Sequence, residues 1–220
     1  MAYPTWRQLS DEVKAIIDNA SWDVTAIEPI INQVYVGVCE HERVHLPDLE
    51  TSSALTSSTT LSYIALPTDI QTGRKRALFG CKNATQNHVP VPVYSSVSVL
   101  RSKFSGYDQV GTIQGCAVRG GFLHYQRIPE AAESLIVSYW KKATVLTAPD
   151  SSTPILIPSE DIARRILIHG TCKEIFPRIY QDAPQTHPMV VWSTGEYNKA
   201  LAELISLVGP WDMGFDSFSG

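Results

Sequence analysis

The residues best suited to chemistry stand at positions 41–45, where His41-Glu42-Arg43-Val44-His45 matches the pattern H-E-x-x-H. In zinc hydrolases with this pattern, two histidines one helical turn apart bind the metal, and the glutamate activates a metal-bound water. The surrounding residues argue against that chemistry. Arg43 would place a cation beside Zn²⁺, Pro47 would leave His45 on a fraying helix end, and no third ligand follows at a fitting distance. We predict instead the polar C-terminal end of a helix, where these side chains suit the helix dipole. A zinc metallohydrolase that uses His41, Glu42 and His45 stays as an alternative.

The other polar residues predict no catalytic site and no cofactor. The chain has neither a G-x-S-x-G nucleophile motif nor a glycine-rich phosphate loop. Asp69 follows Leu66-Pro67 and is typical of a turn. His124, His169 and His187 are predicted to be ordinary core or surface histidines. We therefore expect a protein that is not an enzyme.

The four cysteines, Cys39, Cys81, Cys116 and Cys172, are widely scattered, and no C-x-x-C pair occurs. This spacing predicts neither a zinc site nor a redox pair. Cys39 and Cys172 fall on apolar helical faces, which favours small core residues. All four suit a reducing cytoplasm.

Length and composition indicate a soluble chain with one domain, or one domain carrying an insertion. Its 220 residues are 44% hydrophobic and 18% charged, with a net charge of −4. An acidic chain argues against gripping DNA, because phosphate neutralisation needs clustered Lys and Arg. The one short basic cluster, Arg74-Lys75-Arg76, is typical of a solvated loop. Neither a signal peptide nor a membrane-spanning run is predicted.

Local signals place helices at both ends of the chain and strands between them. Thr5 and Gln8 have capping-box spacing, and a second helix is predicted to begin near Asp23 or Thr25. Pro158-Ser159 opens a third helix, which Pro177 ends or kinks. The last helix is predicted over 188–208, with Gly209-Pro210 closing it and a break at Gly195 left open.

The middle of the chain alternates short apolar runs with turn residues, which is typical of a small antiparallel sheet or barrel. The segment 47–60 is rich in Ser and Thr and is predicted to be a loop. Strands are predicted around 61–65, 77–81, 89–100, 111–118, 121–127 and 135–140. The predicted fold class is therefore α+β: N-terminal and C-terminal helices form a small bundle, and a β-sheet or barrel domain is inserted. The predicted parts are 1–46, 47–157, 158–208 and an extended tail over 209–220.

The tail carries three aromatic residues, Trp211, Phe215 and Phe218, with two acidic residues and no basic one. The segment is too short and too rich in glycine to fold alone. Burying one aromatic side chain is worth about 2 kcal/mol, and aromatic anchors are common at the centres of interfaces. We predict that the tail docks on a partner, the alternative being that it folds back over its own core.

The order of parts resembles the head-to-tail adaptor (connector) proteins of tailed bacteriophages. The resemblance covers most of the chain, although the β insertion is long beside the smallest, all-helical adaptors. It rests on these segments: Trp22-Asp23, Ile30-Ile31-Asn32-Gln33-Val34-Tyr35, Leu66-Pro67-Thr68-Asp69, Tyr139-Trp140-Lys141, Leu146-Thr147 and Pro154-Ile155-Leu156-Ile157-Pro158.

The resemblance implies a structural virion protein of the neck or connector region, made in the host cytoplasm. Such adaptors form a homo-oligomeric ring, commonly a dodecamer, that joins the portal protein to tail or nozzle proteins. DNA passes through during ejection without specific binding, which an acidic chain would suit. Carried over to this chain, Trp211, Phe215 and Phe218 become the portal-binding residues. A monomeric β-rich binding module is the remaining alternative.

Overall fold

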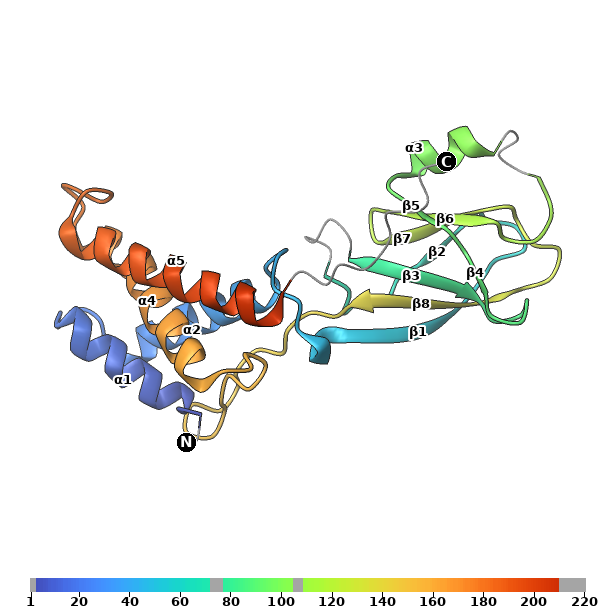
Figure 1. Ribbon diagram of the computed structural model, residues 1–220. Helices are drawn as coiled ribbons and strands as arrows, with labels where there is room; N and C mark the ends of the chain where they lie inside the picture. The colour runs from blue at the N-terminus through green and yellow to red at the C-terminus, as the bar shows by residue number, and fades with distance from the viewer. Residues whose placement is uncertain (1–2, 72–76, 105–108, 210–220) are drawn as a thin grey trace. The chain divides into compact units, whose positions relative to one another are not determined.

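The computed structural model describes residues 3–71, 77–104 and 109–209, and these divide into two compact units (Figure 1). The helical unit combines the described residues of Met1–Pro47 with those from Ala143 onward, and the β-rich unit is Asp48–Lys142. The sequence placed the end of the insertion at residue 157, but residues 143–157 belong to the helical unit. They are tied to it because the Asn32 amide bonds both backbone groups of Leu146, and the Glu40 carboxylate accepts the Ala143 N–H.

The N-terminal helices are α1, Trp6–Ile17, and α2, Val24–Cys39. The predicted capping box of α1 is present, with Thr5 and Gln8 bonding each other's backbone N–H groups. At α2 the cap is Asp23, which accepts the Ala26 N–H at 2.8 Å. Thr25, the other predicted start, lies within the first turn, and its hydroxyl donates to Asp23.

The C-terminal helices are α4, Glu160–Ile179, and α5, Pro188–Val208. Ser159 caps α4 and Gly209 ends α5, as predicted. Pro177 lies within the last turn of α4 and does not end it, and α5 runs through Gly195 without a break. The interior of the helical unit is formed by fully buried residues of all four helices: Leu9, Val13, Ile27, Ile31, Ala163, Ile166, Leu167, Cys172, Ile175, Phe176, Ala200 and Leu204.

The β-rich unit has two four-stranded sheets. The first has the order β1-β8-β3-β4 and is antiparallel throughout; its strands are β1, Glu50–Thr56; β8, Ser134–Trp140; β3, Leu78–Asn83; and β4, Val89–Pro90. The second has the order β2-β7-β6-β5; its strands are β2, Tyr63–Ala65; β7, Phe122–Gln126; β6, Gly115–Arg119; and β5, Val93–Tyr94.

The predicted α+β class, with helices at both ends and sheet between them, is confirmed. The sheets do not close into a barrel, so the barrel form of the prediction is wrong. The sheet is also not purely antiparallel, because β5 and β6 run parallel. The long connection between these two strands, residues 95–114, provides the crossover that a parallel pair requires.

Two predictions from the sequence are wrong within the middle segment. The Ser/Thr-rich stretch predicted as a loop contains β1, which pairs with β8 over its whole length after the short 3-10 helix Pro47–Leu49. The strand predicted over 89–100 is instead β4, β5 and the start of helix α3, Val97–Lys103, which Ser96 caps. Pro90 and Pro92 keep this stretch from forming one long ladder strand.

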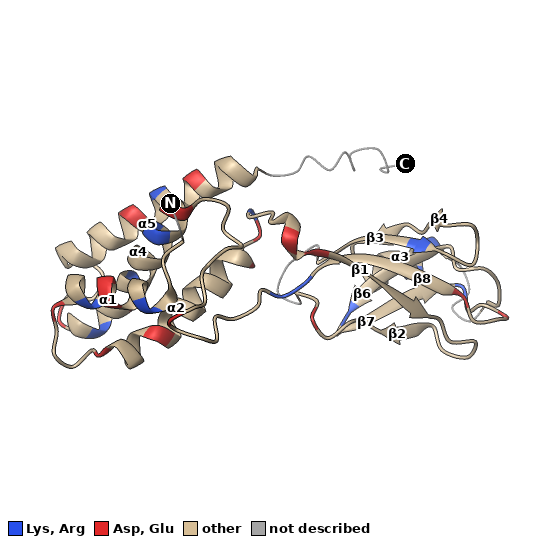
Figure 2. Ribbon diagram, turned by 90° about the horizontal axis from the view of Figure 1, so that it is seen from below, with Lys and Arg blue, Asp and Glu red and all other residues tan. Residues whose placement is uncertain are grey.

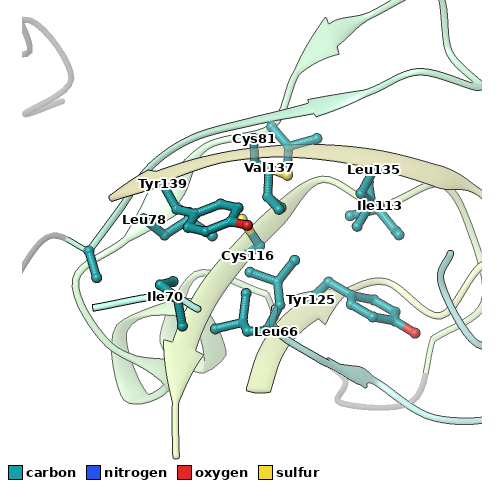
Figure 3. Packing of buried hydrophobic residues seen from close by; sticks show 13 residues of the cluster. Leu66, Ile70, Leu78, Cys81, Ile113, Cys116, Tyr125, Leu135, Val137 and Tyr139 are labelled. Atoms are coloured by element: carbon teal, nitrogen blue, oxygen red, sulfur yellow. The ribbon is translucent and has the colours of Figure 1, made fainter. Parts of the chain in front are cut away.

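The core of the β-rich unit lies between the two sheets (Figure 3). Leu135, Val137 and Tyr139 point into it from β8, and Leu123 and Tyr125 enter it from β7. This is the alternation expected where one face of a strand is buried.

Candidate interaction surfaces

The H-E-x-x-H segment does not lie on a helix. Helix α2 ends at Cys39, and the chain turns at once, with the Val44 N–H donating to the His41 carbonyl at 3.0 Å. The His41 ring nitrogen Nδ1 accepts the Arg43 N–H at 3.2 Å. The prediction that residues 41–45 form the polar end of the helix is therefore wrong, because the helix stops before them. Among the described residues, no group of three or more His, Cys, Asp and Glu side chains is placed to share a metal ion.

The predicted portal anchors Trp211, Phe215 and Phe218 lie outside the described residues, as does the basic cluster Arg74-Lys75-Arg76. Their roles stay predictions. None of the helices in the described part of the chain is long and apolar enough to span a bilayer.

An aromatic cluster stands on the outer face of the second sheet. Tyr63 of β2 and Phe122 of β7 are 39% and 41% exposed, and their rings meet edge to face with centroids 5.4 Å apart. The His124 ring lies 5.6 Å from that of Tyr63, centroid to centroid. The register explains the grouping, because Tyr63 lies opposite His124 and Ala65 lies opposite Phe122. We call Tyr63, Phe122 and His124 the aromatic patch.

Two arginines give the aromatic patch a positive surrounding. Partial burial of His124, together with the charges of Arg101 on α3 and Arg119 on β6, lowers the pKa of its imidazole. The ring is therefore held neutral more strongly than a free histidine. Aromatic faces beside guanidinium groups suit a partner that offers carboxylates and apolar side chains.

Helix α3 covers the neighbouring half of the same sheet face. Val97 and Leu100 pack on Ala117 of β6, with Tyr94 and Phe104 against them. This leaves the β2–β7 half, which bears the aromatic patch, without such cover among the described residues. The outer face is thus apolar across both halves, although only one half is buried within the chain.

The helical unit exposes apolar side chains on α5. Val191 is 57% exposed and Trp192 is 43% exposed, and the Trp192 ring meets the His169 ring edge to face at 4.9 Å. Burial lowers the pKa of His169. Leu207, near the other end of α5, is also exposed. Exposed Trp and aliphatic side chains on one helix are typical of a surface that binds another protein.

Three residues of the H-E-x-x-H segment line a surface hollow. His41, Glu42 and Arg43 face Asn198, Leu201, Ala202 and Ile205 of α5 around a volume of about 450 Å³. A smaller hollow of about 190 Å³ lies among α2, α4 and α5 beside Gly170 and Tyr197. Both are lined by mixed polar and apolar side chains.

Counted over the sequence, the two units carry opposite net charge, and Figure 2 colours the charged residues of the described part by sign. The sequence of the helical unit has eight Lys and Arg against sixteen Asp and Glu, a net charge of −8. That of the β-rich unit has ten Lys and Arg against six Asp and Glu, a net charge of +4. The whole-chain net charge of −4 is therefore the sum of an acidic unit and a basic unit.

Comparison with known proteins yields no match, either among models of protein families or among curated proteins. The candidate surfaces therefore rest on the chain's own geometry.

Sequence reasoning missed the aromatic patch because its members come from strands about 60 residues apart. Alternation within Phe122–Gln126 was a usable signal, since it assigns Phe122 and His124 to one face. Sequence reasoning also treated the cysteines as unrelated, although Cys81 and Cys116 lie together in the core of the β-rich unit.

Proposed function

We propose that this chain is a structural subunit of a phage head-to-tail adaptor, in which copies form a ring between the portal protein and tail or nozzle proteins. The observation that carries the proposal is that the chain has two units of opposite net charge, each of which exposes apolar side chains. A surface of this kind is suited to contacts between copies in which unlike patches meet. Such heterologous contacts generate rings when the rotation between subunits closes.

Charge complementarity supports contact between the β-rich unit of one copy and the helical unit of the next. Opposite charge steers encounter and disfavours like-with-like pairing. The exposed side chains supply the apolar area that an interface needs at its centre: Tyr63 and Phe122 on one unit, and Val191 and Trp192 on the other.

The portal contact is assigned to residues 209–220, through Trp211, Phe215 and Phe218. Their side chains lack a basic neighbour within that segment, so they would enter a groove that is apolar or basic. Binding would bury the aromatic area of these side chains. The ring leaves a passage for DNA, and the acidic net charge of the chain disfavours retention of the genome.

Co-purification of the full chain with a portal ring tests the proposal. We expect a complex in which the electron-microscopy map shows a ring of twelve copies of this chain bound to the portal. Deletion of residues 210–220 should abolish portal binding and leave both folded units intact by circular dichroism. Failure of the full chain to bind portal rings would refute the proposal. Undiminished binding by the truncated chain would show that residues 210–220 do not form the portal contact.

The aromatic patch gives a second, separate test. Tyr63→Ala combined with Phe122→Ala should weaken assembly into rings, whereas Val110→Ala, which removes another exposed apolar side chain of the β-rich unit, should not. Analytical ultracentrifugation of each variant mixed with portal rings measures ring assembly and distinguishes the double variant from the control. Equal assembly by both variants would exclude the patch from the subunit contact.

A further inference from the structure

We propose that Cys81 and Cys116 form a reversible disulfide site that joins the two sheets of the β-rich unit. The two cysteines belong to the apolar cluster between the sheets, where their thiols are close enough to interact (Figure 3). Cys81 lies on β3 of the first sheet, and Cys116 lies on β6 of the second. The site does not depend on the function proposed above.

The backbone brings these strands together at the place where the chain passes from one sheet to the other. The Val91 N–H donates to the Cys81 carbonyl at 2.9 Å, and the Cys116 N–H donates to the Pro92 carbonyl at 2.9 Å. Both cysteines are therefore bonded to adjacent residues of a single crossing segment. This anchoring holds β3 and β6 near each other at this point, and a disulfide between them requires such proximity.

The environments of the four cysteines differ in a way that favours this pair. Burial raises the pKa of Cys39 and of Cys172 to about 12, which keeps both as inert thiols. Interaction with the Cys116 thiol lowers the pKa of Cys81, while the same interaction and burial raise the pKa of Cys116. Cys81, which is 5% exposed against 0% for Cys116, is thus the attacking thiolate.

The oxidant that fits a site this buried is a small hydroperoxide. The Cys81 thiolate attacks one oxygen of hydrogen peroxide, the O–O bond breaks, and a sulfenic acid and hydroxide form. Cys116 gives its proton to the hydroxide, its thiolate attacks the Cys81 sulfur, and the sulfenic hydroxyl leaves as hydroxide and is protonated to water. In total two thiols lose two electrons, and one peroxide becomes two waters.

The test is oxidation of the purified full chain with hydrogen peroxide, followed by alkylation under denaturing conditions. We expect the four free thiols to fall to two, a mass loss of two hydrogen atoms, and a peptide linking Cys81 to Cys116. Because the bond closes a loop of some 35 residues, the melting temperature of the β-rich unit should rise by on the order of 10 °C. Dithiothreitol should reverse all of these changes.

Matched variants separate this pair from the others. Cys39→Ala with Cys172→Ala should keep the cross-link, and Cys81→Ala should abolish it. If Cys81→Ala fails to fold, the peptide map of the unaltered chain still decides. Four persistent thiols, oxidation of single cysteines without a link, or a link through Cys39 or Cys172 would overturn the proposal.

Discussion

Replacing Gly170 with alanine tests how closely the helices of the helical unit pack. A methyl group at this position would lie 2.6 Å from the Val34 Cγ1 atom of α2 and 3.0 Å from two ring carbons of Tyr197 on α5. Separations this short require one of the neighbours to move. Val34 is β-branched and has one preferred rotamer in a helix, so it yields at a cost.

Two opposing contributions set the change in unfolding free energy for Gly170→Ala. Alanine gains about 1 kcal/mol over glycine inside a helix. Overpacking a close-packed interior costs roughly 1–3 kcal/mol. Gly195 is the matched control, because it also lies inside a helix and a methyl group there meets no atom within 4 Å. The difference in unfolding free energy between the two alanine variants therefore isolates the steric cost of roughly 1–3 kcal/mol.

Urea denaturation followed by circular dichroism at the helical minimum measures both variants. We expect Gly195→Ala to stabilise the helical unit and Gly170→Ala to be less stable than that control. Adding Val34→Ala to Gly170→Ala should recover part of the loss, since the two sites are in contact. Equal stability of the two single variants would refute the close approach of α2, α4 and α5 at this point.

Three further changes have defined outcomes. Glu133→Ala removes the acceptor of the buried Asn83 amide (2.7 Å) and of the Ile113 N–H (3.3 Å). It should lower the unfolding free energy measured in urea by about 3 kcal/mol. Glu130→Ala, the control at an exposed site, should lower it by under about 0.5 kcal/mol. Because burial lowers the pKa of His169, the unfolded chain binds more protons below about pH 6.5. The unfolding free energy of the helical unit should therefore fall between pH 7 and pH 5, and His169→Phe should flatten that dependence. Raising the salt concentration from about 0.05 M to 0.5 M should weaken contacts between copies, because salt screens the attraction between the oppositely charged units. If assembly is the same at both salt concentrations, charge has no role in it.

The features that the sequence predicted correctly are those fixed by neighbours in the chain. Two helix starts were predicted correctly, one from Thr5 with Gln8 and one from Ser159, and Gly209 correctly predicted a helix end. These predictions succeed because capping is decided within a few residues. The segment 50–56 was missed because its Ser and Thr residues show no apolar alternation, and its strand character comes from pairing with β8. The same limit hid the thiol pair, since Cys81 and Cys116 meet only once two sheets have formed.

The outer face of the second sheet is the part of the fold that bears most directly on the proposed function. On one half of this face, helix α3 packs Val97 and Leu100 against the apolar surface of the strands. Beside that helix, Tyr63 and Phe122 present the same kind of surface to solvent, with two arginines close to His124. Leaving it uncovered costs roughly 25 cal/mol for each Å² of apolar area. A partner with carboxylates around an apolar centre would recover that free energy, and the acidic helical unit of a second copy has the matching charge.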